Sequence, residues 1–357
     1  MILSAGFLGL SAMVLGVDLA LAKEGRLKIG ESSVPTSSPR TPPLTLPDRL
    51  LPPWLLDTLE VSLTLRGIGW QFGRHVNVSK EYRPLERGPF LKATAVCFVQ
   101  NYLVLDICLV SFKVLPGIGE STGGSLYYSG LHPLIRYPLA LSLTLLSMVT
   151  LVSGMQTCYA LATLFGVAIL LQSPSQWPPI MDNPFAADSL HDFWSKRWHQ
   201  ALRRTFVVSG GIPGYWIGGQ SGFVLGTFLA SGLFHEGGTY LVGRGIDHNV
   251  TLYFVLQGVG LLLERYWRYI TGRRVEGAFG RMWVRIFLIA SSQIACTYVS
   301  ILYILARAQG SVILVDSWFR RGLAGGTIIP SSLSLATRFI LPALRELSGQ
   351  FLFVDVY

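Results

Sequence analysis

Charged residues are scarce in this sequence. Only 14% of the 357 residues are Asp, Glu, Lys or Arg, whereas a soluble domain normally carries about 25%. Half of the residues are hydrophobic, and many of them form long apolar runs. The length alone would allow two or three soluble domains. The shortage of charge predicts instead one all-α polytopic membrane protein.

Cysteine is also rare. The four cysteines, Cys97, Cys108, Cys158 and Cys296, lie far apart and inside apolar stretches. Their spacing is neither that of a disulfide framework nor that of a zinc site. We therefore interpret them as small apolar packing residues.

Several motifs of known chemistry are missing. His235 and Glu236 are not followed by the second histidine of an HExxH zinc site, because Thr239 and Tyr240 follow instead. No GxSxG elbow precedes a usable acid and histidine, which disfavours a serine hydrolase. The glycine-rich segment 65–74 lacks GxGxxG spacing, so a phosphate-binding loop is disfavoured. We expect neither a metal nor a permanently bound cofactor.

Bases outnumber acids, and the formal net charge is +9 at pH 7. No nucleic-acid recognition motif accompanies this excess, so we expect no nucleic-acid partner. The bases lie between apolar segments, mainly in residues 23–92, 196–204 and 273–285, as juxtamembrane Lys and Arg do. We expect a multi-pass protein of the endoplasmic reticulum membrane, with these regions near the cytosol.

The chain is expected to have three parts. Residues 1–22 are apolar and lack a preceding base, which favours a retained membrane span over a cleaved signal peptide. Residues 23–60 are rich in Pro and Ser and predict a cytosolic linker. Residues 61–357 hold the remaining apolar segments and form the main membrane domain.

We expect seven or eight apolar segments in all. After the first, the candidates are residues 94–115, 134–172 (long enough for two spans hinged near Gly154), 212–243 (one crossing, either whole or broken at its glycines), 250–270, 286–308 and, as a borderline case, 322–342. Counting these crossings puts the basic segments 23–92 and 189–204 on opposite sides of the membrane. One segment is therefore expected to be re-entrant, broken or interfacial, and the sequence leaves the three options open.

Residues 189–204 predict an amphipathic helix in the membrane interface, capped by Asp188 or Ser189. One reading is an anchor on anionic lipid. The other is a binding site for a polyanionic cosubstrate, in which bases contact phosphates and a tryptophan stacks on a ring. The residues that would form this site are Trp194, Lys196, Arg197, Trp198, Arg203 and Arg204.

His235 is the second candidate site, because it follows a stretch without charge from Gly222 to Leu233. Ionisable residues at membrane depth are costly and usually line a cavity or form a pair. Burial favours the neutral imidazole, which is the form a general base needs. A satisfied pair of His235 and Glu236 in the core is the alternative.

Small residues share the same apolar run. Gly222, Gly226 and Ala230 follow a small-xxx-small spacing, which predicts close helix packing rather than catalysis. Ser231 lies one turn before the histidine and leaves room for a substrate or a helix neighbour.

Three motifs together resemble the wax synthase-like branch of the membrane-bound O-acyltransferase (MBOAT) superfamily. They are Asn183-Pro-Phe, Ser189-Leu-x-x-Phe-Trp-Ser-Lys-Arg-Trp-His199 and Ser231-Gly-Leu-Phe-His-Glu236. Arg66-Gly-Ile-Gly-Trp70 is similar to a segment of fungal members, which acetylate hydroxyls of terpenoids and related natural products. The resemblance covers roughly residues 60–310.

This resemblance implies a multi-helix bundle with an internal tunnel, an acyl-CoA donor (acetyl-CoA favoured) and a hydrophobic hydroxylated acceptor within the bilayer. His235 matches the catalytic histidine, and Glu236 and Ser231 would support or orient it. His199 stands where related diacylglycerol acyltransferases have an asparagine. Its role stays open between a second catalytic group, a hydrogen-bond donor to the thioester oxygen and a structural residue.

Other functions also remain open. A wax ester synthase would perform the same reaction with long acyl chains. A non-enzymatic carrier of lipids or metabolites would use His235 and Glu236 as a proton relay, although the absence of repeated halves counts against it. A terpene cyclase is disfavoured because its acids would have to come from the scattered Asp18, Asp106 and Glu264.

Overall fold

The computed structural model describes residues 66–74, 76–113, 130–241 and 248–296, with some isolated positions elsewhere, such as 128 and 246. The expected first span and the linker fall almost entirely outside the described residues. The end of the expected segment 286–308 and all of 322–342 also lie outside them.

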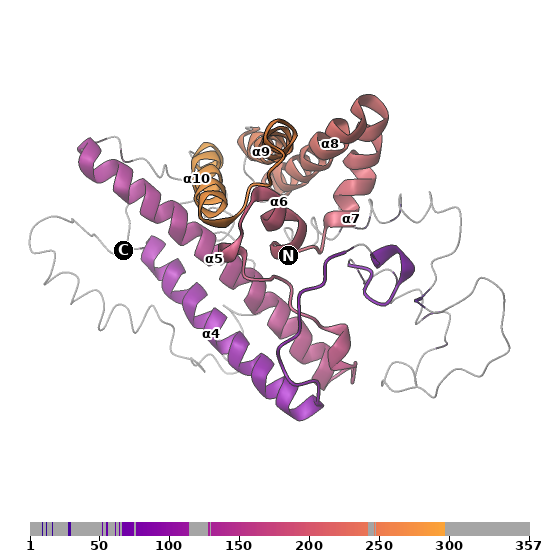
Figure 1. Cartoon of the computed structure of the whole chain (residues 1–357). Coiled ribbons are helices and arrows are strands. Elements are labelled where there is room, and N and C mark those ends of the chain that lie inside the picture. Colours follow the sequence, from indigo (N-terminus) through magenta and orange to yellow (C-terminus); the bar gives the residue numbers. More distant parts are fainter. Residues whose placement is uncertain are drawn as a thin grey trace, which may run out of the picture.

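The described part is built from helices, as the composition predicts (Figure 1). The long helices are α4 (Arg87–Lys113), α5 (Pro133–Ala168), α8 (Ile212–Leu241), α9 (Asn249–Thr271) and α10 (Gly277–Cys296). The short ones are η1 (Gln71–Gly73), η2 (Pro174–Gln176), η3 (Pro184–Ala186), α6 (Leu190–Asp192), η4 (Phe193–Arg197), α7 (Arg203–Phe206) and η5 (Val207–Gly211).

Three stretches within the described residues are long and apolar enough to cross a membrane. They are Arg87–Cys108, Pro133–Ala168 and Arg203–Tyr240. The first confirms the expected segment at 94–115, extended by about two turns toward its N-terminus. α9 and α10 are not among the three by this measure of length and composition.

α5 corrects the expectation of two spans hinged near Gly154. It is one continuous helix of 36 residues, about 54 Å long. A side chain at Gly154 would meet only Leu105 at 3.7 Å, so this glycine neither bends the helix nor allows an unusually close neighbour. Buried Ser and Thr hydroxyls along α5 bond to carbonyls four residues earlier, as Thr144 and Thr157 do, and this satisfies them inside the helix.

α4 and α5 lie side by side and cross α9 and α10 steeply (Figure 1). α8 packs against α9, and α9 against α10. Beneath α9 and α10, the short elements α6 and η4 contribute to a buried cluster. Its buried members are Ala187, Leu190, Phe193, Val284 and Leu288. This cluster fixes residues 189–204, which we call the aromatic-basic segment, within the protein.

Residues 212–243, expected as one crossing either whole or broken at its glycines, are broken in the structure. At Gly218 and Gly219 the backbone leaves helical geometry, with φ of Gly219 at +56°, and the chain reverses. The stretch from α7 to residue 217 therefore packs back on the rest of α8 as a helical hairpin (Figure 1). Trp216 and Ile217 at its tip are 78% and 90% exposed.

The two arms of this hairpin touch through glycine backbones. A Cβ on Gly210 would lie 2.1 Å from the carbonyl oxygen of Gly226, and a Cβ on Gly214 would lie 2.2 Å from that of Gly222. Side chains at these positions would force the arms apart. The prediction that the row of small residues packs a helix is therefore confirmed.

Replacing Gly226 tests this packing. A Cβ there would lie 2.2 Å from the Gly210 carbonyl oxygen, so Gly226→Ala should destabilise the fold by about 1–3 kcal/mol through overpacking. Gly218→Ala is the matched control, because a Cβ at Gly218 meets nothing within 4 Å. Thermal unfolding in detergent should show a lower midpoint for the first variant only. An equal loss in both variants would contradict the glycine contact.

Candidate functional site

The segment 189–204 is not the continuous helix that the sequence predicts. α6 and η4 end at Arg197, and Trp198 is extended, with φ of −72° and ψ of 152°. The side-chain amide of Gln200 donates to the carbonyls of Trp194 and Trp198, at 3.0 and 2.8 Å. These bonds occupy carbonyls that a continuing helix would use, so the chain turns and resumes as α7 at Arg203.

The start of this segment is held by side-chain caps. Ser189 Oγ accepts the Asp192 N–H at 2.9 Å, which confirms the predicted cap. The Glu264 carboxylate of α9 accepts the N–H groups of Leu190 at 2.6 Å and His191 at 3.0 Å. It also accepts the indole N–H of Trp283 of α10. The sequence counted Glu264 only as a scattered acid, since a bond across 74 residues leaves no local signal.

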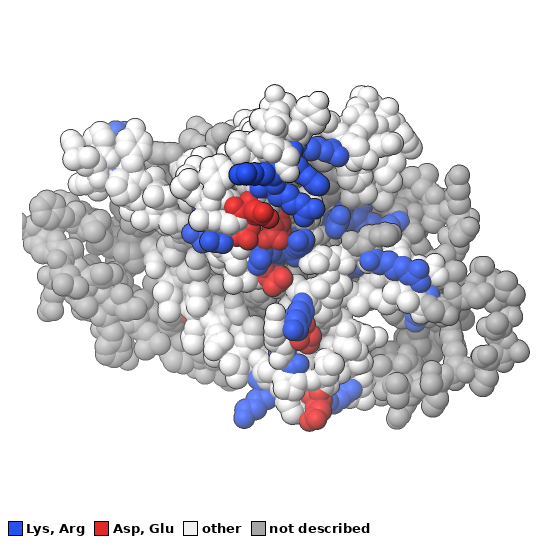
Figure 2. Space-filling model, in the orientation of Figure 1, with Lys and Arg blue, Asp and Glu red and all other residues white. Residues whose placement is uncertain are grey.

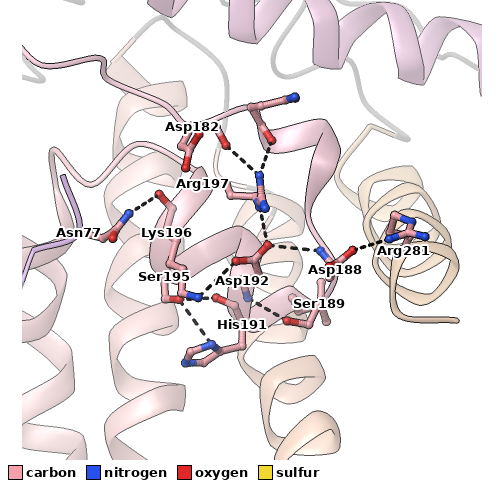
Figure 3. Close-up of polar contacts among 12 residues, drawn as sticks. Asn77, Asp182, Asp188, Ser189, His191, Asp192, Ser195, Lys196, Arg197 and Arg281 are labelled. Carbon is pink, nitrogen blue, oxygen red and sulfur yellow. Dashed lines mark hydrogen bonds and ion pairs between the residues drawn. The ribbon is translucent and has the colours of Figure 1, made fainter. Parts of the chain in front are cut away.

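The polar face of α6 and η4 is organised around Asp192 (Figure 3). Its carboxylate bonds Arg197 and lies 3.7 Å from the ammonium group of Lys196. The Arg197 guanidinium also reaches the backbone carbonyls of Asp182 and Asn183, at 3.4 and 3.5 Å. Arg197 is therefore engaged inside the segment, whereas the Lys196 side chain is 57% exposed.

The two tryptophans of the motif are partly buried. Trp198 stacks on Phe193, with ring centroids 5.4 Å apart. Trp194 meets Phe228 of α8 edge to face at 5.5 Å, and its indole N–H reaches Gln257 of α9 at 3.4 Å. These contacts join η4 to α8 and α9. The main role of the two rings is therefore to pack the segment around His199 against the helix that carries His235.

The remaining two bases begin α7. Arg204 lies over the ring of Phe72, with its guanidinium 5.0 Å from the centroid. Phe72 belongs to the turn after the Arg66–Trp70 segment, and Arg66 is itself buried. The Arg66 guanidinium donates to the carbonyls of Pro178 and Pro179, both at 3.0 Å. The segment thus docks against the loop that leads into α6.

His235 lies on the second arm of the hairpin. Its Nδ1 is 2.7 Å from the Ser231 carbonyl oxygen. Because a carbonyl only accepts, the Nδ1 atom carries the proton, and Nε2 keeps its lone pair. The ring stacks on Phe254 of α9 at 4.4 Å. The partly buried imidazole is therefore held in one tautomer and one orientation, and Ser231 contributes its backbone rather than its hydroxyl.

The Glu236 side chain bonds to the start of α9. Its carboxylate accepts the N–H groups of His248 at 3.0 Å and Thr251 at 3.2 Å, and the Thr251 hydroxyl at 3.1 Å. These donors stand at the start of α9. Glu236 thus caps α9 and fixes the helix whose Phe254 stacks on His235.

His199 follows the end of η4 and lies outside the candidate spans. Its ring packs near Trp198, at 5.3 Å between centroids. Its Nδ1 is enclosed and has no hydrogen-bond partner among the described residues. Burial lowers the pKa of His199 to about 3, and the charges of His235 and Arg66 add to the effect. The ring is therefore neutral near pH 7, and it is within electrostatic reach of His235.

This lowered pKa makes stability depend on pH. The His199 pKa is about 3 in the fold and about 6.5 in an unfolded chain. Between these values the unfolded state binds a proton that the native state excludes, so stability falls as the pH falls. The unfolding midpoint should therefore drop more steeply from pH 7 to pH 5 in the wild type than in His199→Asn. His132→Asn, at an exposed helix cap, should follow the wild type, and identical slopes in all three proteins would refute the burial of His199.

Comparisons with known proteins concern this same region. Residues 177–257 match the membrane bound O-acyl transferase family. The matched stretch begins in the loop held by Arg66 and ends at Gln257. It includes α6, η4, the hairpin and both histidines. No solved structure matches the chain.

Several fungal proteins are similar over longer stretches. The O-mevalon transferase macI of Penicillium terrestre is 25% identical over 273 residues, which cover 68% of this chain and 60% of that protein. The O-mevalon transferase yanI of Aspergillus niger is 25% identical over 264 residues, 66% of this chain and 56% of that protein. The acetyltransferase eriL of Hericium erinaceus is 27% identical over 193 residues, 50% of this chain and 48% of that protein.

The chain thus spans less than two thirds of the length of the relatives it matches. The matched family and the fungal relatives agree with the resemblance predicted from the aromatic-basic and histidine motifs. The stretch that carries both histidines is therefore the part of this chain that is similar to the membrane bound O-acyl transferase family.

Proposed function

We propose that this protein is a membrane-bound enzyme that transfers an acyl group from acyl-CoA to a hydroxyl group of a hydrophobic acceptor. The observation that carries the proposal is the fixed tautomer of His235, whose Nδ1–H donates to the Ser231 carbonyl and leaves Nε2 as a proton acceptor. A base of this kind is what alcohol attack on a thioester needs.

The reaction follows from the two histidines. Nε2 of His235 removes the proton of the bound hydroxyl while its oxygen attacks the thioester carbonyl. The new C–O bond forms, the C–S bond breaks, and the proton passes from His235 to the departing thiolate. His199 donates a hydrogen bond to the thioester oxygen as negative charge develops there. A neutral imidazole and the asparagine of the diacylglycerol acyltransferases share this ability to donate.

The bases near α7 suggest where the cosubstrate CoA binds. Lys196 has an exposed side chain, and Arg203 and Arg204 stand at the start of α7. We assign these three to the phosphates of CoA because they follow one another closely, at the end of η4 and the start of α7. Trp194 and Trp198 support the site by packing. In this arrangement CoA arrives from the cytosolic face of the endoplasmic reticulum, and the acceptor arrives from the bilayer.

The acyl group and the acceptor are proposed from the relatives. Acetyltransferases such as eriL favour acetyl-CoA as the donor, and their fungal sources favour a terpenoid or related secondary metabolite as the acceptor. The two O-mevalon transferases add a mevalonyl thioester to the donors to be tried. A long acyl chain would make the enzyme a wax ester synthase.

Removal of the base is the first test. Microsomes with wild type or His235→Ala are incubated with labelled acetyl-, mevalonyl- and long-chain acyl-CoA and a panel of hydroxylated terpenoids and fatty alcohols. The variant should lose about 10²–10⁴-fold in rate, and His132→Asn should keep the wild-type rate. Undiminished acyl transfer by His235→Ala would show that His235 is not the general base. If the wild type uses none of the donors, the enzyme hypothesis is wrong and the hypothesis of a non-enzymatic carrier remains.

A second substitution separates the possible roles of His199. If this residue donates a hydrogen bond, His199→Asn should keep much of the activity, and His199→Leu should lose about 10²–10³-fold in kcat. The rates are measured with the best donor at saturating acceptor, beside the unfolding midpoints of both variants. Equal losses in the two variants, with equal stability, would rule out the donor role.

A further inference from the structure

The end of α9 and the start of α10 form a basic and aromatic surface outside the histidine site. We define the α9–α10 turn surface as residues 265–285. It contains six arginines and one glutamate, and Lys and Arg gather on the face of the molecule where these helices end (Figure 2). The arginines are Arg265, Arg268, Arg273, Arg274, Arg281 and Arg285, and all of them are exposed.

Large apolar side chains stand between these arginines. Tyr269 is 85% exposed and Tyr266 61%, and Ile270, Phe279 and Met282 are each more than half exposed. Single exposed apolar residues are common and need no explanation. A group of exposed apolar residues around one helix–helix connection, interspersed with arginines, is typical of a segment that lies in a membrane interface.

The turn between the helices holds these side chains in one unit. Gly272 ends α9 with φ of +68° and donates its N–H to the Arg268 carbonyl. Gly277 begins α10 with φ of +66°. Both backbones lie in the left-handed region that favours glycine. The rings of Trp267 and Phe279 then meet at 6.0 Å across the turn, so the two helix ends present a common surface.

The charges of the surface call for an anionic partner. α10 has no acid in its first turn, and Arg281 follows soon after. Bases near a helix N-terminus are opposed by the helix dipole. Asp188 offsets one of them through its bond with Arg281 at 3.1 Å. Glu276 is the one acid within the surface itself, so most of its positive charge is not balanced by its own acids.

We propose that the α9–α10 turn surface binds the headgroups of anionic phospholipids. A soluble polyanion would satisfy the arginines but leave the exposed aromatic side chains in water. An anionic membrane interface supplies phosphates and an apolar boundary at once, and long basic side chains reach the first while the rings enter the second. The surface also adjoins the aromatic-basic segment, through Arg281 and Asp188.

The test uses the full chain purified in a neutral detergent. Phosphatidylglycerol or phosphatidylcholine is titrated into the micelles, and lipid binding is followed by the rise in the unfolding midpoint. Phosphatidylglycerol should act at lower concentration than phosphatidylcholine. Arg273→Gln/Arg274→Gln should weaken its apparent affinity by about 25-fold at low salt, since each base near an anionic surface contributes about fivefold.

Two control variants isolate the location and the charge. Lys80→Gln/Lys92→Gln removes the same charge from exposed positions elsewhere and should lose much less affinity for phosphatidylglycerol than Arg273→Gln/Arg274→Gln. Arg273→Lys/Arg274→Lys should retain most of the affinity. All variants should unfold at the wild-type midpoint without lipid, because the substituted side chains are exposed.

Three results would overturn the proposal. One is equal affinity of the wild type for the two lipids. Another is an equal loss in Arg273→Gln/Arg274→Gln and in the Lys80/Lys92 control. The third is stabilisation by free CoA that depends on Arg273 and Arg274 as strongly as the lipid effect does, which would assign the surface to a soluble nucleotide. None of these measurements requires acyl transfer, so the failure of the proposed enzyme function would leave the lipid test intact.

Discussion

Two buried carboxylates, each capping the start of another helix, hold the site together. Glu236 of α8 satisfies backbone N–H groups at the start of α9, and Glu264 of α9 does the same at the start of α6. Water is scarce where helix ends are buried, and an unsatisfied N–H group there is costly. The carboxylates therefore tie α8 to α9 and α9 to α6, and this order brings the two histidine-bearing segments together.

The neighbouring residues His235 and Glu236 have separate tasks. The imidazole is oriented by a carbonyl of its own helix, one turn earlier. It needs no acid to select its tautomer, which leaves the next residue available to cap α9. The adjacent carboxylate and imidazole invite comparison with a proton relay, but the bonds of Glu236 described above lead to α9.

Much of this architecture follows from local patterns. The apolar runs predict helices, Ser189 predicts a cap, and the row of small residues at 222, 226 and 230 predicts close packing. All three are confirmed. The aromatic-basic motif and His235 also locate the region that matches the family. These features are encoded in residues close to one another in the chain.

The features that the sequence did not predict depend on distant partners or on competition between nearby bonds. Gln200 ends the expected helix by taking two carbonyls, although helical spacing continues through it. A break at glycines is an option in both apolar runs. Gly218 and Gly219 do leave helical geometry, whereas α5 continues through Gly154, and the sequence does not distinguish the two cases. The role of Glu264 requires knowledge of which helix start lies beside it. Helical periodicity shows which face of a helix is apolar, but it does not show which element packs against that face.

The length of α5 has a consequence for the membrane around the protein. A continuous helix of 36 residues is about 54 Å long, whereas the hydrocarbon core is about 30 Å thick, so α5 either tilts or extends beyond the core. Because α4 packs along α5, a tilt of α5 turns the pair of helices into a sloping wall. Lipids beside such a wall meet the protein at graded depth. A hydrophobic alcohol that diffuses along this slope changes its depth in the bilayer without leaving the protein surface.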